Sequence, residues 1–334
     1  MLEPSSLDKL KGKKNLLAFS GGGDSTALFF LLLKHNIKFD IAIVNYNQRA
    51  QSEEEVKYAK DLADIHSLAC YVHIAPKVRK NFEAKAREIR YDFFEKLILK
   101  YGYENLLTAH HLGDRFEWML MQFCKGAGCA EIAGMTFEQK RDFYTLVRPL
   151  LHLDKKELLI FLHANKIKYF EDESNLNEDI KRNSFRHNYS LPLLEKYLSG
   201  IKKSFNYIDE DIENLLPEIE IKTINDFAYF KSSNNKRADI FTIDKYLKSN
   251  FHMPTANERE LLKNEKSVVI GRKFIIVQEK NFIFIMPLLK EKIQLPKEFK
   301  EECRILKIEP KIRPFLYKNN QAFLKIKELF IIAK

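Results

Sequence analysis

Cysteine, glycine, proline and tryptophan are all scarce in this chain. Its 334 residues include 4 cysteines, 11 glycines, 10 prolines and 1 tryptophan, and the longest uninterrupted apolar run covers only residues 27–33. A membrane-spanning helix needs roughly 20 apolar residues, and collagen-like chains need far more glycine and proline. The amino terminus also lacks the apolar segment and cleavage site of a secretory signal. We therefore expect a cytoplasmic protein without a membrane partner.

The four cysteines are too widely spaced to indicate a metal site. Cys70, Cys124, Cys129 and Cys303 form no C-x-x-C pair. Such pairs are typical of zinc and iron–sulfur sites, and an even set of cysteines in a short secreted chain indicates a disulfide framework. The spacing here favours none of these. Cys124 and Cys129 flank a glycine-containing turn, and we interpret them as two partly buried thiols.

The composition is that of a folded chain with a basic second part. Hydrophobic residues make up 45% and charged residues 31%, as in ordinary globular proteins. At roughly 150 residues per domain, the length predicts about two domains. Of the net charge of +10, residues 201–334 contribute +7, with 26 Lys and Arg against 19 Asp and Glu. This balance favours a polyanion such as RNA, or an anionic membrane surface, as a partner.

Strand-like and helix-like patterns alternate through the first half of the chain. Short apolar runs predict strands at residues 15–19, 41–46, 70–74, 105–108 and 144–147. Periodic apolar residues predict helices at residues 25–34, 52–66, 81–100, 112–124 and 155–165. Alternation of this kind indicates β-α units, and hence an α/β fold with a parallel sheet.

The pattern changes in the second half. Helical stretches without intervening strands follow Arg182, and the stretch around Pro217 favours a domain boundary nearby. Further strands are predicted at residues 267–270, 274–278 and 281–286. We therefore predict a first domain of residues 1–205 and a smaller, basic α+β domain of residues 206–334.

A glycine-rich segment follows the first predicted strand. Residues 20–25 read Ser-Gly-Gly-Gly-Asp-Ser and open an apolar helix. Consecutive backbone N–H groups and a helix N-terminus then meet at the carboxyl edge of the sheet, which favours anion binding. The glycines let a phosphate approach the backbone, and the hydroxyls of Ser20 and Ser25 add donors without charge. The segment therefore predicts a phosphate-binding loop.

Two common nucleotide-binding motifs fit this loop poorly. The Gly-Lys-Ser/Thr ending of a Walker A loop is missing, which argues against a lysine-clamped NTPase. The dinucleotide fingerprint is matched only in part, and the second strand ends at Asn45 and Tyr46 instead of the acidic residue that would hold a ribose. We therefore do not expect a nicotinamide cofactor.

The loop and the polar residues after it together resemble a known family. Ser-Gly-Gly-Gly-Asp-Ser is similar to the PP-loop of ATP pyrophosphatases, which split ATP between its α and β phosphates. The downstream motifs are, in order, Asn45 and Arg49, Ala86-Arg87, Arg90-Tyr91, Thr108-Ala109-His110-His111, Asp114, Glu117, Lys125-Gly126, Gly128, Arg148-Pro149-Leu150-Leu151, Glu171-Asp172, Ser174-Asn175, Arg182-Asn183 and Arg186. In this order they resemble the tRNA(Ile)-lysidine synthetase family over residues 14–195. The chain departs from the family at Tyr46, Gly113 and Trp118.

The resemblance implies both a fold and an activity. The fold is a parallel-sheet PP-loop domain of the adenine nucleotide alpha hydrolase type, followed by the basic appendage. The activity is the ligation of free L-lysine to C2 of the wobble cytidine in the isoleucine tRNA with a CAU anticodon. ATP and Mg²⁺ are the implied cofactors, an adenylated cytidine is the intermediate, and AMP and pyrophosphate are released. The sequence leaves a homodimer open.

The implied reaction begins with phosphate chemistry at the loop. The residues that would bind ATP are Ser20, Gly21, Gly22, Gly23, Asp24 and Ser25. Asp24 is the natural Mg²⁺ ligand beside the pyrophosphate, because a hard cation prefers carboxylate oxygens. A helix N-terminal cap is the alternative role for this side chain.

The second step needs a neutral lysine amine. With a pKa of about 10.4, a lysine side chain is almost entirely protonated at pH 7, so a base or a desolvated pocket is required. His110, Asp114 and Glu117 follow the fourth strand, and the 114/117 spacing puts both carboxylates on one helix face. We assign the three jointly to lysine binding, amine activation and metal support, with helix caps or solvated charges as the alternative. We interpret His111 as structural.

Basic residues supply the expected contacts to tRNA or phosphate, because guanidinium groups match phosphate oxygens. The candidates are Arg87, Arg90, Lys125, Arg182 and Arg186. Solvated surface charge is the alternative for each. Two other functions stay open: a PP-loop tRNA thiolase, which would need a sulfur-carrying cysteine or cluster, and a non-catalytic protein that binds adenine nucleotide or tRNA.

Overall fold

The computed structural model describes residues 1–47, 51–76, 82–171, 181–215, 219–289, 291 and 293–332. The motif residues Arg49, Asp172, Ser174 and Asn175, and the region of Pro217, lie outside them. The chain divides into two compact units, Met1–Glu210 and Asp211–Lys334. This division falls within helix α9 (Leu191–Leu215), a few residues beyond the predicted boundary after residue 205.

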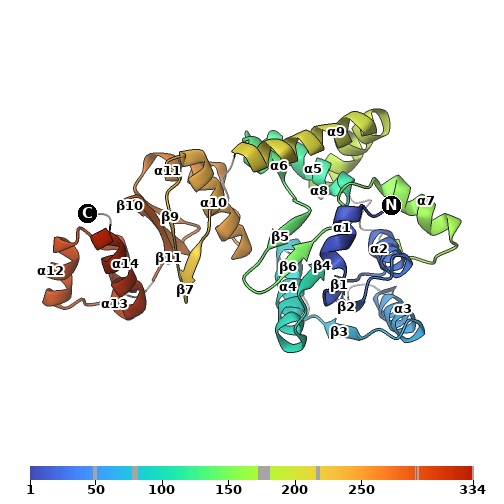
Figure 1. Cartoon of the computed structure of the whole chain (residues 1–334), viewed down its shortest axis with the longest axis horizontal. Helices are drawn as coiled ribbons and strands as arrows, with labels where there is room; N and C mark the ends of the chain where they lie inside the picture. The colour runs from blue at the N-terminus through green and yellow to red at the C-terminus, as the bar shows by residue number, and fades with distance from the viewer. Residues whose placement is uncertain are drawn as a thin grey trace. The chain divides into compact units, whose positions relative to one another are not determined.

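A six-stranded sheet forms the centre of the first unit (Figure 1). Its strands are β1 (Asn15–Ala18), β2 (Phe39–Asn45), β3 (Cys70–Ile74), β4 (Asn105–Leu107), β5 (Glu138–Lys140) and β6 (Thr145–Val147). They lie in the order β3-β2-β1-β4-β6-β5, and the first five are parallel to their neighbours. The predicted parallel sheet is confirmed. The edge strand β5 runs antiparallel to β6, and its polar sequence, Glu-Gln-Lys, did not predict a strand.

The helices of the first unit follow the predicted pattern. They are α1 (Pro4–Leu10), α2 (Gly23–Lys34), α3 (Gln51–Ile65), α4 (Phe82–Tyr101), α5 (Leu112–Phe123), α6 (Cys129–Ala133), α7 (Lys155–Ala164), α8 (Lys181–Phe185) and α9, with a π-helical turn at Arg186–Ser190 between the last two. The predicted helices are confirmed in α2, α3, α4, α5 and α7, and the short α1 and α6 are additions.

Two layers of helices cover the sheet. Successive strand residues point to opposite faces, so Leu17 and Ile41 join the core formed with α2, α3 and α7. Leu16 and Ala42 point the other way and pack in the cluster formed with α4. Helices cover both faces of the sheet, so polar groups for a ligand are expected in the loops at the carboxyl ends of the parallel strands.

The second unit is built on an antiparallel sheet (Figure 1). Its strands are β7 (Lys222–Ile224), β8 (Phe227–Lys231), β9 (Ser267–Ile270), β10 (Phe274–Glu279) and β11 (Phe282–Pro287), in the order β7-β8-β11-β10-β9. One face packs on α10 (Lys236–Ser249) and α11 (Ala256–Asn264). The other packs on α12 (Lys297–Ile305), α13 (Arg313–Lys318) and α14 (Asn320–Ile332). The predicted α+β class is confirmed, and β7 and β8 are strands that were not predicted.

Among the described residues, no helix combines the length and the apolar character that a bilayer crossing requires.

Candidate active site

The glycine-rich loop joins β1 to α2 and takes a fixed shape. Gly21 has a φ of +76°, a left-handed conformation that favours glycine. Gly22 is the N-cap of α2, so the first backbone N–H groups of this helix lack intrahelical partners and remain at the loop. The chain therefore presents the positive end of a helix dipole at the carboxyl edge of the sheet.

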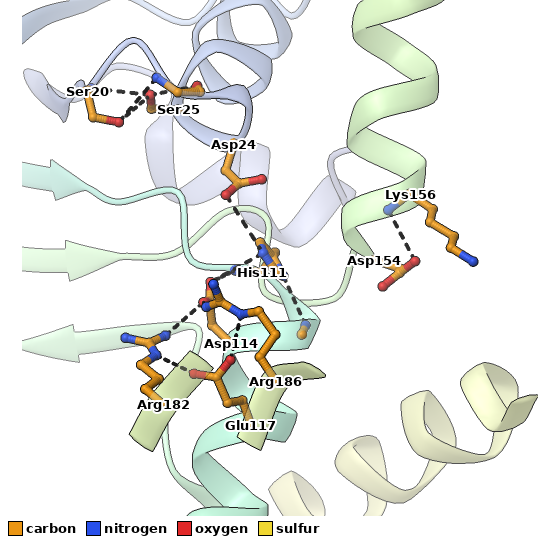
Figure 2. A network of polar contacts seen from close by, with 12 residues as sticks. Ser20, Asp24, Ser25, His111, Asp114, Glu117, Asp154, Lys156, Arg182 and Arg186 are labelled. Atoms are coloured by element: carbon orange, nitrogen blue, oxygen red, sulfur yellow. Dashed lines mark hydrogen bonds and ion pairs between the residues drawn. The ribbon is translucent and has the colours of Figure 1, made fainter. Parts of the chain in front are cut away.

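Hydroxyl groups close the loop into a compact turn. The Oγ atoms of Ser20 and Ser25 lie 3.0 Å apart, and the backbone N–H of Ser20 donates to Ser25 Oγ over 3.2 Å (Figure 2). The Thr26 hydroxyl donates to the carbonyl of Gly21 over 3.2 Å. These bonds preorganise the loop before a ligand binds.

A segment that follows α7 lies against the same loop. Gly22 forms a parallel bridge with Phe170, whose N–H donates to the Gly21 carbonyl over 3.0 Å. A Cβ atom at Gly23 would lie 3.4 Å from Cδ2 of Tyr169. The loop therefore pairs with the backbone at Phe170 and lies in contact with the ring of Tyr169.

Asp24 lies in the first turn of α2 and is not its N-cap, which is Gly22. Its Oδ1 atom is buried and has no hydrogen-bond partner, and its Oδ2 atom is 3.8 Å from Nε2 of His111. A buried carboxylate oxygen without a donor suits a hard cation. Among the described residues, no three His, Cys, Asp or Glu side chains gather into a metal site of their own. The Asp24 carboxylate would therefore fit as one protein ligand of a Mg²⁺ ion.

His111 connects this loop to helix α5. It is the N-cap of α5: its Nδ1 atom accepts from the N–H of Gly113 over 3.0 Å, and its own N–H donates to Oδ2 of Asp114 over 3.1 Å. With Nδ1 as the acceptor, the proton of a neutral ring lies on Nε2. That nitrogen is 3.8 Å from Asp24 and 3.6 Å from Asp114 (Figure 2). His111 thus has the structural role that we predicted and also lies between two candidate catalytic carboxylates.

Two arginines face the two carboxylates of α5. Arg182 donates to Asp114 Oδ1 over 2.9 Å and also contacts Glu117. Arg186 donates from Nε to Glu117 Oε2 over 2.8 Å, and its guanidinium lies 3.5 Å from Asp114 (Figure 2). Glu117 is only 1% exposed. Helix α8 and the π-helical turn after it therefore hold the acidic face of α5 in an ion-pair network, which the 114/117 spacing alone did not reveal.

The surroundings shift two pKa values in this region. Burial alone would raise the pKa of Asp114, but His111, His110 and Arg182, together with the backbone hydrogen bond from His111, hold it well below its usual range. Burial lowers the pKa of His110 to about 3; Asp114 opposes the shift, and Arg148, Arg87 and Arg182 add to it. His110 is thus neutral at pH 7, and its Nδ1 lies 2.9 Å from the hydroxyl of Thr108.

Three predicted contact residues lie outside this network. Arg87 and Arg90 are exposed on α4, and Lys125 is exposed in the turn after α5. The structure also corrects the interpretation of two cysteines: Cys124 and Cys129 are exposed rather than partly buried. Cys124 is the C-cap of α5 and Cys129 begins α6, and the short turn between them covers neither thiol.

The comparisons with known proteins agree with this fold. Residues 3–192 match the PP-loop domain model. The fold is similar to that of a U34-tRNA thiolase from Methanococcus maripaludis solved with its [4Fe-4S] cluster, with a TM-score of 0.53, 17% identity, and coverage of 64% of this chain and 76% of that one. The fold and the loop define a PP-loop protein of the ATP-utilising class.

Two curated relatives narrow the class. The tRNA(Ile)-lysidine synthase of Helicobacter pylori is 44% identical over 312 residues, which cover 93% of this chain and 91% of that protein. The tRNA(Ile)-lysidine synthase of Campylobacter jejuni is 44% identical over 311 residues, covering 93% and 94%. The chain belongs to the tRNA(Ile)-lysidine synthase family.

Proposed function

We propose that this protein is an ATP-dependent ligase that joins the ε-amine of L-lysine to C2 of the wobble cytidine in the isoleucine tRNA with a CAU anticodon. The observation that carries the proposal is the continuity of the site, in which His111 connects Asp24 of the phosphate loop to the carboxylates of α5. An activation site for phosphate and a binding site for an amine then share one edge of the sheet. We further propose that the reaction takes place in the cytoplasm.

The first step converts an unreactive carbonyl into a leaving group. Oxygen O2 of cytidine attacks the α-phosphate of ATP, the bond to the β-phosphate breaks, and pyrophosphate departs. The loop from Ser20 to Ser25 binds the phosphates through its N–H groups and hydroxyls, which are already oriented by their mutual bonds. Asp24 would hold Mg²⁺, and this ion would supply charge neutralisation for the phosphates.

The second step forms the carbon–nitrogen bond. The neutral ε-amine of lysine attacks C2, the bond between C2 and O2 breaks so that AMP leaves with O2, and the attacking nitrogen loses one proton to solvent water. Because its pKa is low, Asp114 is a partner for the ammonium ion and a poor proton acceptor. We propose that Asp114 and Glu117 bind and orient the amine. Their charges favour the ammonium form, whereas loss of water as lysine enters and the positive charges of Arg182 and Arg186 beside them favour the neutral amine. Neutral His110 lies beside this path as a hydrogen-bond partner.

The arginines have two proposed roles. Arg182 and Arg186 orient the carboxylates through the ion pairs described above, and guanidinium groups of this kind also match the oxygens of a phosphate. Exposed Arg87, Arg90 and Lys125 are proposed contacts to the tRNA backbone. We propose that the basic second unit adds further, sequence-independent contacts to the tRNA.

One incubation tests the function. The protein is mixed with ATP, labelled lysine and bulk tRNA, and the tRNA is then digested for nucleoside analysis. We expect label in a modified cytidine, and AMP formation that needs both tRNA and lysine. A thiolase would incorporate sulfur and would not need lysine, and a non-catalytic binding protein would form no AMP, so either result would overturn the proposal.

A further inference from the structure

Arg115 is a buried cation of α5 that the proposed reaction does not use. Its side chain is 5% exposed, and its Nε atom donates to the Ala133 carbonyl over 3.1 Å. Its two terminal nitrogens donate to the carboxylate of Asp209 over 2.8 and 2.5 Å. The guanidinium carbon lies 4.3 Å from the centroid of the Phe205 ring. Every nitrogen of the guanidinium therefore has a partner, and the planar group is fixed in one orientation.

These contacts join α5 to two other helices. One is α6, which ends at Ala133, and the other is α9, which contains Asp209 (Figure 1). The first turns of the helical segment 181–215, which ends with α9, supply the two arginines that pair with the acidic face of α5. Arg115 precedes Glu117 by two residues, or about 200° around a helix of 3.6 residues per turn. The two side chains leave opposite faces, so the segment contacts α5 on both.

The apolar packing between α5 and α9 would not fix the rotation of α5 by itself. Its buried residues are Leu112, Phe116, Leu194 and Phe205. Apolar contacts have no preferred direction, whereas a bidentate pair of guanidinium and carboxylate accepts one geometry. A buried ion pair also adds little net stability, because the cost of desolvation offsets the Coulomb attraction. The main effect expected of this pair is therefore on the orientation of α5.

The start of α5 is anchored without Arg115. The N–H of Leu112 donates to the Leu153 carbonyl over 2.9 Å, and the ring of His111 caps the helix. His111, which lies near the phosphate loop, therefore keeps its position when Arg115 is changed. Glu117 lies more than a turn further along, so its direction depends on how α5 is rotated.

We propose that Arg115 is a positioning residue for the lysine-transfer step. Through its ion pair with Asp209 it fixes the rotation of α5, and hence the direction of the carboxylates of Asp114 and Glu117. The inference rests on the proposed function and adds to it a residue that touches no substrate. An error of about 1 Å in the placement of reacting groups can cost up to about a hundredfold in rate. The pair should therefore affect lysine transfer and leave the phosphate chemistry at the loop unchanged.

The test removes the ion pair without leaving a buried charge. In the double variant Arg115→Met/Asp209→Asn both charges are absent, so the Tm should stay close to that of the wild-type protein. The kcat/KM for lysine should fall at least about tenfold, whereas tRNA-dependent pyrophosphate release and the KM for ATP should be unchanged. The matched control is Glu195→Gln, which removes the exposed carboxylate that α9 pairs with Lys156 and should keep lysine transfer within about twofold.

The single tryptophan of the chain reports on α5 directly. Trp118 directly follows Glu117, and a Cβ atom at Gly134 would lie 2.7 Å from its Cδ1, so the ring packs against this glycine. Its fluorescence needs no substrate and is measured well below the Tm, where global stability has no influence. In the double variant we expect a red shift of the emission and stronger quenching by acrylamide. Glu195→Gln should give the wild-type spectrum.

Three results would overturn the proposal. They are wild-type lysine kinetics in the double variant, an unchanged Trp118 emission, and falls in lysine transfer and pyrophosphate release that run in parallel, as a general loss of structure would cause. If the double variant does not fold, Asp209→Asn alone takes its place, because the Asp209 side chain is 45% exposed. If the wild-type protein incorporates no lysine, the proposed function fails, and the Trp118 emission still decides whether the ion pair fixes α5.

Discussion

Glu117→Gln tests how the acidic face of α5 is held. The change keeps the shape of the side chain and removes its negative charge. The NH₂ group of the new amide would then face N–H donors of Arg182 or of Arg186, so one hydrogen bond is lost. Glu117 is 1% exposed, but the side chains of Arg182 and Arg186 are 37% and 21% exposed and can recover hydration. We therefore expect a loss of about 1.5–3 kcal/mol, as for a hydrogen bond to a charged group, below the ~3–5 kcal/mol for breaking a fully buried pair.

Thermal unfolding at pH 7 measures this loss. For a unit the size of Met1–Glu210, it corresponds to a fall in Tm of roughly 3–12 °C. Lysine incorporation should fall with it, while ATP binding at the loop persists. The matched control is Glu195→Gln, because Glu195 pairs with Lys156 over 2.9 Å on an exposed surface and such pairs contribute little. A fall in Tm no larger than that of the control would refute the claim that the arginines fix α5.

Three further changes address the loop, the neutral histidine and the second unit. Asp24→Ala and Gly22→Val should both abolish tRNA-dependent pyrophosphate release. Gly22→Val should cost little stability, because a Cβ at Gly22 meets nothing closer than 3.4 Å. Normal release by either variant would contradict the loop assignment. His110 has a folded pKa of about 3 against about 6.5 when unfolded, so its contribution to stability is complete above about pH 6.5 and is lost as the pH falls toward 3. His110→Gln should therefore flatten the dependence of Tm on pH in that window, and an unchanged slope would show that the ring is not held neutral. Reversing the charges of Lys297, Lys300 and Lys307 should weaken tRNA binding and reduce the slope of log K against log salt by about 0.7 to 0.9 per lost phosphate contact. AMP formation should be restored at saturating tRNA. An unchanged salt slope would mean that these three side chains do not contact the tRNA.

The sequence by itself determined the alternation of strands and helices, the glycine loop and the family. Apolar runs such as residues 15–19 and 105–108 and the periodic helices between them are local patterns, and they were sufficient to predict the parallel sheet. The loop could be recognised because its glycines, hydroxyls and carboxylate are contiguous, so that their chemistry needs no folding to be seen.

Only the tertiary structure decided which side chains meet. The partners of Glu117 come from a segment about 65 residues further on, and Arg87 of α4 and Arg141 of the turn after β5 meet at the ring of Tyr91. Such contacts depend on the order of the strands in the sheet and on the packing of segments that are distant in the sequence, whereas side-chain periodicity indicates only the local secondary structure. The two adjacent histidines illustrate the difference: the capping geometry of α5 places His111 near Asp24, and burial keeps His110 neutral beside Thr108.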